Sequence, residues 1–285
     1  MYRQELGERG KPAFYQGRVA QAIVDVINQN GGVMTLGDLS SHDSEVITPI
    51  STEYKGVRLW ELPPNSQGLA ALLMLNILEN FPQLKAKGHN SSDYIHVLVE
   101  AVRLALTDAL RYLGDSSHVT IPLETLLDKG YSHQRAQLIS TDRAMERVEP
   151  GLMTGSDTVY FCVIDSERNA CSFVNSNYMG FGTGLVPKDC GFSLQNRGAN
   201  FSLCRNHINC VAGRKRVYHT IIPALLTDST TTSQKPRLLA ALGVMGAFMQ
   251  PQGHVQVQSQ QASQSNNVRH KDICFLTLFL PGYCL

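Results

Sequence analysis

The pattern of hydrophobic and polar positions predicts a mainly helical first half. The segment "GRVAQAIVDVINQNGG" places its apolar residues on one helical face and ends in two glycines, which predicts a helix that stops there. "QGLAALLMLNILENF" predicts a buried helix capped by Ser66, and "DYIHVLVEAVRLALTDALRYLGD" predicts a longer one capped by Ser92. Between them and the first helix, "EYKGVRLWELP" predicts a hairpin with its turn at residues 54–56.

The pattern changes to strands after residue 157. "TVYFCVI" and "ACSFVNS" flank the turn "DSERN", and strand-like runs punctuated by glycine follow, including "VYHTIIPALL", "RLLAALGVMGAF" and "HVQVQS". Helices followed by consecutive strands predict an α+β fold with a largely antiparallel sheet. From about Gln256 the chain is polar and low in complexity, which is typical of an exposed tail. The last apolar segment, "ICFLTLFLPGYCL", has no predicted place in the fold.

Composition and charge exclude several classes of protein. The 285 residues are 43% hydrophobic, enough for the core of one large domain or two small ones. The net charge of +1 does not indicate a nucleic-acid partner or an anionic membrane. No stretch reaches the roughly 20 apolar residues that a bilayer span needs, and the N-terminal segment lacks the apolar core of a signal peptide. We expect no membrane span and a cytoplasmic location.

The cysteine pattern predicts thiols rather than disulfides. Seven cysteines without paired spacing indicate a reducing compartment. In "CRNHINC", Cys204, His207 and Cys210 recur every three residues, which suits either a metal cluster or a plain loop. Because no fourth ligand is evident, the loop is the favoured interpretation. We expect neither a metal nor a cofactor.

Thr158 has two interpretations. It follows Asp157 directly and begins a predicted strand, where a β-branched residue is common. A threonine hydroxyl is also a nucleophile once a base removes its proton, and an α-amino group with a pKa of about 7.7 can be that base if the threonine is N-terminal. An internal threonine becomes N-terminal by attacking the preceding carbonyl to form an ester that water then cleaves. "GSDTVYF" provides the small, polar approach to the strand that this reaction needs.

The wider context favours the second interpretation. "DTVYFCVID", "NACSFVNSNYMGFGTGLVPKDCGFSLQNRG", "YHTIIPALL" and "GVMGAFMQPQGHVQV" resemble the gamma-glutamyltransferase family of N-terminal nucleophile hydrolases, and within it the glutathione hydrolase-like branch. Upstream, "FYQGRVAQAIVDVINQNGGVMTLGDL" and "LPPNSQGLAALLMLNILE" extend the resemblance, which covers roughly residues 10–257. It implies a four-layer αββα sandwich, incomplete here because the family's first and last segments have no counterpart. We therefore expect a chain truncated at both ends.

The resemblance also implies how the chain is processed. Cleavage between Asp157 and Thr158 would separate 1–157, the helical C-terminal part of a large subunit, from a small-subunit region at 158–257 that starts with the nucleophile, followed by an atypical tail at 258–285. The two fragments are expected to stay associated. The expected partner is a small γ-glutamyl amide such as glutathione, which would be hydrolysed or used for transfer.

The family's site residues map onto this sequence one by one. Thr158 matches the nucleophile, and Ser176 stands where a threonine hydroxyl orients it, unless it is an ordinary strand serine. The backbone N–H groups of Gly246 and Ala247 match the oxyanion hole. Thr220 is expected beside them. Together with His219 it matches the hydroxyl pair that lines the substrate site, although His219 is equally interpreted as a core histidine.

Three positions depart from the family pattern. Asn200 replaces the carboxylate that binds the substrate's α-amino group, Arg197 replaces a glutamine, and Tyr178 replaces an asparagine. An arginine binds a carboxylate through two parallel hydrogen bonds, so Arg197 is an expected substrate anchor, with a solvated loop arginine as the alternative. With these departures we still expect amide hydrolysis, but we do not expect the substrate to be strictly a γ-glutamyl amide. Three functions remain open: a γ-glutamyl hydrolase or transferase, a hydrolase of another acyl amide such as a β-lactam side chain, and an inactive member that only binds a partner.

Overall fold

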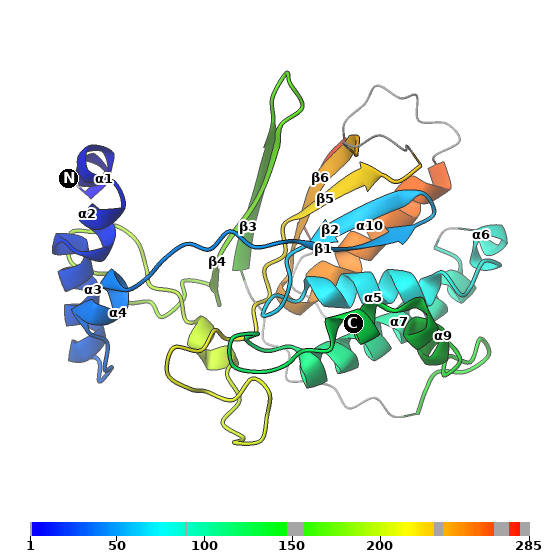
Figure 1. Cartoon of the computed structure of the whole chain (residues 1–285), viewed down its shortest axis with the longest axis horizontal. Coiled ribbons are helices and arrows are strands. Elements are labelled where there is room, and N and C mark those ends of the chain that lie inside the picture. Colours follow the sequence, from blue (N-terminus) through cyan, green and yellow to red (C-terminus); the bar gives the residue numbers. More distant parts are fainter. Residues whose placement is uncertain (1, 89, 147–156, 231–235, 265–273, 280–285) are drawn as a thin grey trace. The chain divides into compact units, whose positions relative to one another are not determined.

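The computed structural model describes residues 2–88, 90–146, 157–230, 236–264 and 274–279. Helices and strands are mixed within these ranges, which confirms the α+β class (Figure 1). The chain forms two compact units, one of Met1–Ile47 with Asn177–Arg197 and the other of Thr48–Ser176 with Gly198–Leu285. The division at Asp157 is a prediction about processing, and it does not coincide with these units.

The first unit is helical in its N-terminal part. It contains α1 (Tyr2–Arg9), α2 (Lys11–Tyr15), α3 (Arg18–Gln29) and α4 (Leu36–Ser40). The helix predicted before the two glycines is α3, whose apolar face is buried. Val19 and Ile23 of this face pack with Cys190 from the later part of the same unit. The helical spacing of apolar residues in the sequence therefore predicted this helix correctly.

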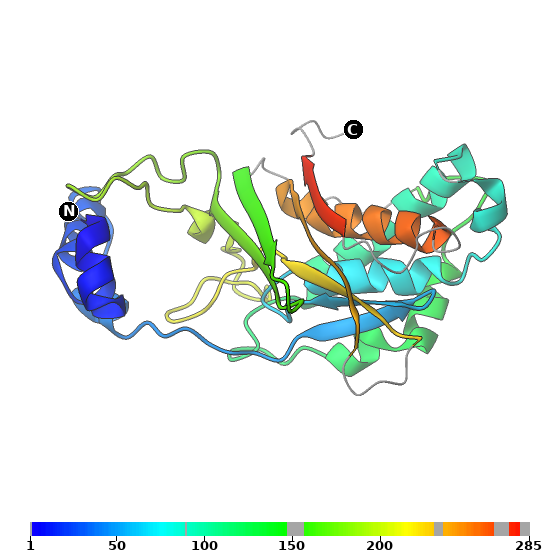
Figure 2. The same ribbon diagram turned by 90° about the horizontal axis from the view of Figure 1, so that it is seen from above.

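The second unit contains a five-stranded sheet in the order β1-β2-β5-β6-β7. Its strands are β1 (Ile50–Tyr54), β2 (Val57–Glu61), β5 (Ala224–Asp228), β6 (Leu238–Met245) and β7 (Cys274–Phe279). The first four are antiparallel, as expected, whereas β7 runs parallel to β6 (Figure 2). The predicted hairpin turn is confirmed, with positive φ angles at Lys55 and Gly56. The late apolar segment thus contributes a strand to the sheet.

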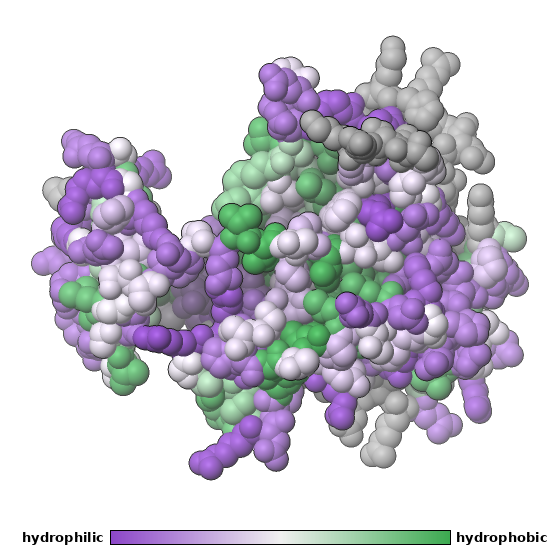
Figure 3. Space-filling model, in the orientation of Figure 1, coloured by the Kyte–Doolittle hydropathy of each residue, from purple (hydrophilic) through white to green (hydrophobic). Residues whose placement is uncertain are grey.

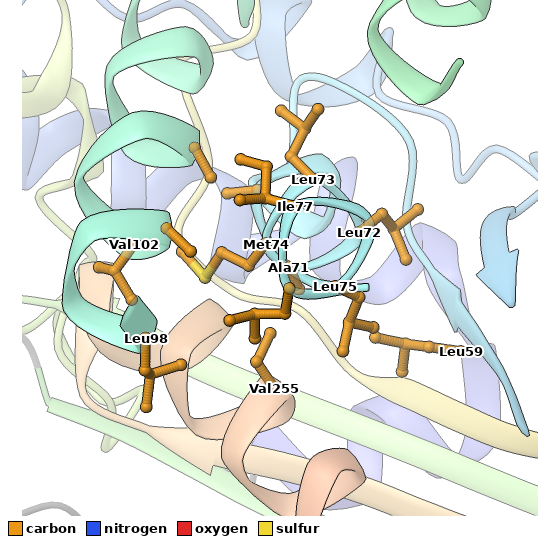
Figure 4. Close-up of a cluster of buried hydrophobic side chains, with 14 of the residues drawn as sticks. Leu59, Ala71, Leu72, Leu73, Met74, Leu75, Ile77, Leu98, Val102 and Val255 are labelled. Carbon is orange, nitrogen blue, oxygen red and sulfur yellow. The ribbon is translucent and has the colours of Figure 1, made fainter. Parts of the chain in front are cut away.

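Helix α5 (Gly68–Leu78) is the centre of the core. Every one of its residues is buried, as its almost entirely apolar sequence predicts; the exception in type, Asn76, is hydrogen-bonded to Thr52. It packs against the sheet, against α7 (Ser92–Tyr112) and against α9 (Lys129–Ala136). Figure 4 shows Met74 directed toward Val102 of α7, and Leu75 toward Leu59 of β2. Two short helices, α6 (Leu84–Lys87) and α8 (Leu123–Leu127), complete this part.

The strand predicted at "HVQVQS" is wrong, because this segment lies in helix α10 (Gln250–Gln264). Val255 and Val257 are two residues apart, a spacing that is also typical of one face of a strand. In the structure both are buried, and so are the polar residues His254 and Gln258 beside them. The polar stretch interpreted as an exposed tail is therefore in part a packed helix. The later tail residues 265–273 and 280–285 lie outside the described ranges.

The strands β3 (Asp157–Ile164) and β4 (Ala170–Tyr178) form a separate two-stranded sheet. One face of β3 carries the buried Thr158 and Tyr160, while Val159, Phe161 and Val163 on the other face are exposed. Figure 3 shows hydrophobic surface over the body of this hairpin and polar surface at its turn. Thr158 therefore faces inward, on the side that packs against the rest of this unit. The remaining 3₁₀ turns are η1 (Arg197–Asn200) and η2 (Ala247–Met249).

The cap of α7 differs by one residue from the prediction. Ser91, not Ser92, is the N-cap, and its Oγ accepts a hydrogen bond from the Tyr94 backbone N–H at 3.2 Å. We expect Ser91→Ala to lower the free energy of unfolding by about 1 kcal/mol, because a helix-terminal N–H loses its partner. Ser92→Ala is the matched control and should change it by less than about 0.5 kcal/mol. Urea unfolding measures both, and a larger loss for Ser92→Ala would contradict the cap.

Candidate active site

Thr158 and Ser176 lie side by side on the two strands of the hairpin. The Thr158 hydroxyl donates a hydrogen bond to the Ser176 Oγ at 3.3 Å. Thr158 is buried, and Ser176 is half-buried. The backbone of Asp157 already belongs to β3, whereas Gly155 and Ser156 of the predicted turn lie outside the described residues. The structure thus brings together the two hydroxyls that the sequence pairs.

Packing beneath Thr158 connects the hairpin to two other segments. Tyr160, two residues further along the same face of β3, forms a cluster with Val174 of β4 and Met245 at the end of β6. Ile221 packs against this cluster. Met245 immediately precedes Gly246, and Ile221 immediately follows Thr220. The chain therefore carries the nucleophile candidate and both oxyanion candidate segments into one packed region of the second unit.

The segment around Thr220 is held along the residues that precede α5. The His219 backbone N–H donates to the Asn65 carbonyl at 2.9 Å, and the Gln67 N–H donates to the His219 carbonyl at 3.0 Å. Ser66 Oγ donates to the Ile221 carbonyl at 2.9 Å. Ser66 is therefore not a helix cap, and the prediction that it caps α5 is wrong: the N-cap position is Gln67, which makes no side-chain capping bond. Thr220 is fully buried, and His219 is half-buried.

Gly246 and Ala247 form a corner between β6 and η2. Both have positive φ angles, 142° at Gly246 and 50° at Ala247. A left-handed conformation at alanine costs about 1–2 kcal/mol, so surrounding contacts must hold it. One such contact comes from Gln67, whose side-chain Nε2 donates to the Ala247 carbonyl at 2.7 Å and to the Thr220 carbonyl at 2.6 Å. No role was predicted for Gln67 from the sequence, and the usable signal was its polar side chain at the start of a mainly apolar helix.

Asn200 and Arg197 have different surroundings. The Asn200 Nδ2 donates to the Tyr218 carbonyl at 2.8 Å, so this residue supports the backbone next to His219. Arg197 is buried, and its guanidinium carbon lies 5.0 Å from the centre of the Tyr178 ring. Burial lowers the pKa of Arg197 to about 10. The alternative of a solvated loop arginine is wrong, because the ring and the surrounding protein cover its side chain.

The segment "CRNHINC" is held by hydrogen bonds of its own. The His207 N–H donates to the Cys204 carbonyl at 3.0 Å, and the Cys210 N–H donates to the His207 carbonyl at 2.9 Å. Within the described ranges, no group of three or more His, Cys, Asp or Glu side chains could hold a metal ion. Five cysteines are free thiols: Cys162, Cys171, Cys190, Cys204 and Cys210.

Comparison with solved structures defines the class of protein. The chain is similar to the crystal structure of a cephalosporin acylase from Bacillus halodurans, with a TM-score of 0.81 and 40% identity. The match covers 90% of this chain and 45% of that one. The fold of the described part of this chain is therefore similar to that of an acylase. Separately, none of the helices in the described part of the chain combines the length and apolar character that a membrane crossing requires.

Sequence comparison identifies the family. The sequence profile described as Gamma-glutamyltranspeptidase matches residues 2–271, and the chain belongs to this family, as the motifs predicted. It is 42% identical to the glutathione hydrolase-like YwrD proenzyme of Bacillus subtilis (strain 168), over 87% of this chain and 45% of that protein. It is 30% identical to the glutathione hydrolase proenzyme of Escherichia coli (strain K12), over 80% of this chain and 42% of that protein. The chain thus spans less than half the length of these relatives.

Proposed function

We propose that this chain carries the catalytic threonine of a self-cleaving γ-glutamyl amide hydrolase or transferase, with Thr158 as the nucleophile. The observation that carries the proposal is the hydrogen bond from the Thr158 hydroxyl to Ser176 on the neighbouring strand. This bond restrains the rotamer of Thr158 and places its oxygen in a fixed position. The proenzyme names of two relatives support a processed chain.

The first proposed reaction is self-cleavage. The Thr158 Oγ1 attacks the Asp157 carbonyl carbon, its proton is transferred to the departing amide nitrogen, and an ester replaces the peptide bond. Water then hydrolyses the ester and restores the Thr158 hydroxyl. The products are an Asp157 carboxylate and a free α-amino group on Thr158. That amino group is the base that the hydroxyl of an internal threonine lacks.

The second proposed reaction is cleavage of the substrate amide. The Thr158 α-amino group takes the hydroxyl proton as Oγ1 attacks the amide carbon, and the leaving amine receives that proton. Backbone N–H groups of Gly246 and Ala247 stabilise the oxyanion, with Thr220 beside them. One donor of this kind contributes on the order of 3 kcal/mol to the transition state. Water or an acceptor amine then removes the acyl group from Thr158.

We propose that the two fragments stay associated after cleavage. Strand β2 precedes the cut and β5 follows it, yet they pair over four residues from Val57 to Trp60. Separating the fragments would expose this sheet edge and the core around α5. The incomplete four-layer αββα sandwich remains our proposed architecture, with the five-stranded sheet and its helices as part of it.

Arg197 is our proposed anchor for a substrate carboxylate, and His219, Asn200 and Tyr178 are proposed to line the substrate site. We expect Arg197→Lys to raise KM about 10-fold with little change in kcat, because an ammonium cannot form the bidentate pair or stack on Tyr178 in the same way. Steady-state kinetics on a γ-glutamyl anilide measure both constants. Lys188→Arg, in an exposed loop, serves as the control. An unchanged KM for Arg197→Lys would rule out this anchor.

A second candidate substrate is another acyl amide, such as the side chain of a β-lactam. The observation that favours it is the similarity to a cephalosporin acylase, together with the arginine and tyrosine at positions 197 and 178. Glutaryl and γ-glutamyl amides of the same amine differ only in the α-amino group. A kcat/KM at least 10-fold higher for the glutaryl amide would favour the acylase, and the reverse ratio would favour the γ-glutamyl enzyme.

Self-cleavage of the purified 285-residue chain tests the proposal directly. We expect a denaturing gel to show fragments of residues 1–157 and 158–285, with the second beginning Thr158-Val159 on N-terminal sequencing. A chain that stays whole after prolonged incubation at neutral pH would overturn the proposal. That result would favour the inactive alternative, a family member that acts only by binding.

A further inference from the structure

Gln67 links two segments that are far apart in the sequence. It immediately precedes α5, and its side chain is fully buried. We infer that Gln67 is a positioning residue that sets the distance between Thr220 and Ala247 and thereby the geometry of the oxyanion site, an inference that rests on the function proposed above. Gln67 itself is not expected to touch the substrate.

The two hydrogens of one side-chain amide are divided between the two segments. Gln67 Nε2 donates to the Thr220 carbonyl at 2.6 Å and to the Ala247 carbonyl at 2.7 Å. Its Oε1 accepts a hydrogen bond from the Tyr218 hydroxyl at 3.2 Å. Because carbonyl oxygens only accept, this arrangement also determines which end of the amide is the nitrogen. Both donors of the amide are therefore used in joining these segments.

The backbone of Gln67 is itself attached to one of the segments it joins. Its N–H donates to the His219 carbonyl, and the Ser66 hydroxyl donates to the Ile221 carbonyl. The residues before α5 and the Thr220 segment are therefore hydrogen-bonded to each other along their length. The Gln67 side chain extends from these paired segments to Ala247, at the corner between β6 and η2. A second glutamine, Gln250, accepts a hydrogen bond from the Ile222 N–H at 3.2 Å and reinforces the same junction.

The contact with Ala247 bears on a proposed oxyanion donor through the backbone rotations of that residue. Ala247 has a φ of 50°, a strained value for alanine that persists only under external constraint. The Ala247 N–H and carbonyl belong to two successive planar peptide units, which are joined by the φ and ψ rotations of Ala247. A hydrogen bond that holds the carbonyl restricts ψ and helps to keep the φ that orients the N–H, one of the proposed donors. Oxyanion donors act over 2.7–3.1 Å by the general geometric criterion, so a shift of about 1 Å is costly in rate. Loss of the Gln67 amide should therefore lower kcat rather than raise KM.

Gln258 offers a matched control for loss of a buried glutamine. It is also fully buried, and its Nε2 also donates to a backbone carbonyl, that of Val57, at 3.1 Å. It lies on α10 and contacts none of the proposed site residues through this bond. Gln67→Met and Gln258→Met remove the same chemical group from the interior. A merely structural role for Gln67 predicts the same behaviour for both variants.

The experiment compares these variants in the full chain by kinetics on a γ-glutamyl anilide and by hydrogen–deuterium exchange. We expect both to lower the melting temperature, but only Gln67→Met to lower kcat 10- to 100-fold with KM within about 2-fold. Only Gln67→Met should also accelerate exchange in both the 219–222 and 246–249 segments. Equal exchange in the two variants, or a change in KM alone, would overturn the inference.

Two further measurements keep the result decisive. If Gln67→Met does not fold, Gln67→Asn replaces it in the experiment. Its side chain keeps the amide but is shorter by one methylene, so we expect the same faster hydrogen–deuterium exchange in the 219–222 and 246–249 segments. In the unaltered chain, both Nε2 hydrogens of Gln67 should be protected from exchange in NMR spectra, and rapid exchange of either would refute the link. If the unaltered chain shows no cleavage and no turnover, the proposed function has failed, whereas the exchange data still decide whether Gln67 joins the two segments.

Discussion

Thr158→Ala is expected to leave the chain uncut and to abolish turnover. Without Oγ1 there is no atom to attack the Asp157 carbonyl, no free α-amino group forms, and no acyl-enzyme can be made. We expect a loss of at least about 10³-fold in both the cleavage rate and kcat, since removal of a covalent nucleophile leaves only binding and oxyanion stabilisation. Denaturing gels and single-turnover kinetics measure the two losses separately.

Two variants of the same strand complete this test. Thr158→Ser retains the hydroxyl and should still cleave, although more slowly, because it loses the methyl group that restricts its rotamer. Val159→Ala alters the neighbouring residue, whose side chain is 63% exposed on the outer face of the hairpin, and should cleave normally. Cleavage of Thr158→Ala at the wild-type rate would show that another residue breaks the chain.

Gly243→Ala is expected to destabilise the second unit and to slow self-cleavage. A Cβ added at Gly243 would lie 2.1 Å from Tyr160 Cδ2, a separation that no relaxed structure tolerates. The ring cannot move away easily, because its hydroxyl is 3.1 Å from Ser172 Oγ, which in turn donates to the Leu242 carbonyl. We expect the free energy of unfolding to fall by about 3 kcal/mol, and β3, with Thr158 two residues away, to shift.

Gly213→Ala is the control for this substitution. A Cβ at Gly213 meets no atom within 4 Å, and the residue is exposed. Chemical denaturation of both variants, together with the cleavage rate under native conditions, separates loss of packing from a general effect of alanine. Equal stability of the two variants would mean that Tyr160 does not pack on β6 as described.

Local sequence patterns correctly predicted the elements whose buried side chains are mainly apolar and the turns that are defined by their own residues. Helix α5 was predicted because nearly all its residues are apolar and buried in the core, and the hairpin at Lys55–Gly56 because glycine adopts a positive φ readily. The strand prediction at "HVQVQS" failed for a different reason. Gln258 is polar yet buried, because its partner is the carbonyl of Val57, 201 residues earlier in the chain. A local pattern contains no information about such a partner.

The same distinction applies to the candidate site. The sequence motifs paired Thr158 with Ser176, and the structure places their oxygens 3.3 Å apart. They did not reveal Gln67, because its role depends on carbonyls 153 and 180 residues away. The side-chain roles of Ser66 and Ser92 were misassigned, since a serine before a helix fits the cap preference whether or not its hydroxyl is used there. The sequence motifs identified the candidate reacting residues, Thr158 and Ser176. The residues that hold the site in place, such as Gln67, were found only from tertiary contacts.

The proposed cut at Asp157 would change the pairing of β2 with β5 from an intramolecular to an intermolecular contact. Before the cut, both strands belong to one polymer, and their meeting is a loop closure whose entropy is set by chain length. After the cut, the same pairing joins two molecules, and its equilibrium depends on protein concentration. Refolding of the processed form is then a second-order process, whereas the precursor folds by a first-order one. The uncut chain is therefore the form in which we expect this fold to assemble, and after the proposed cleavage dilution and denaturant would both favour separation of the two fragments.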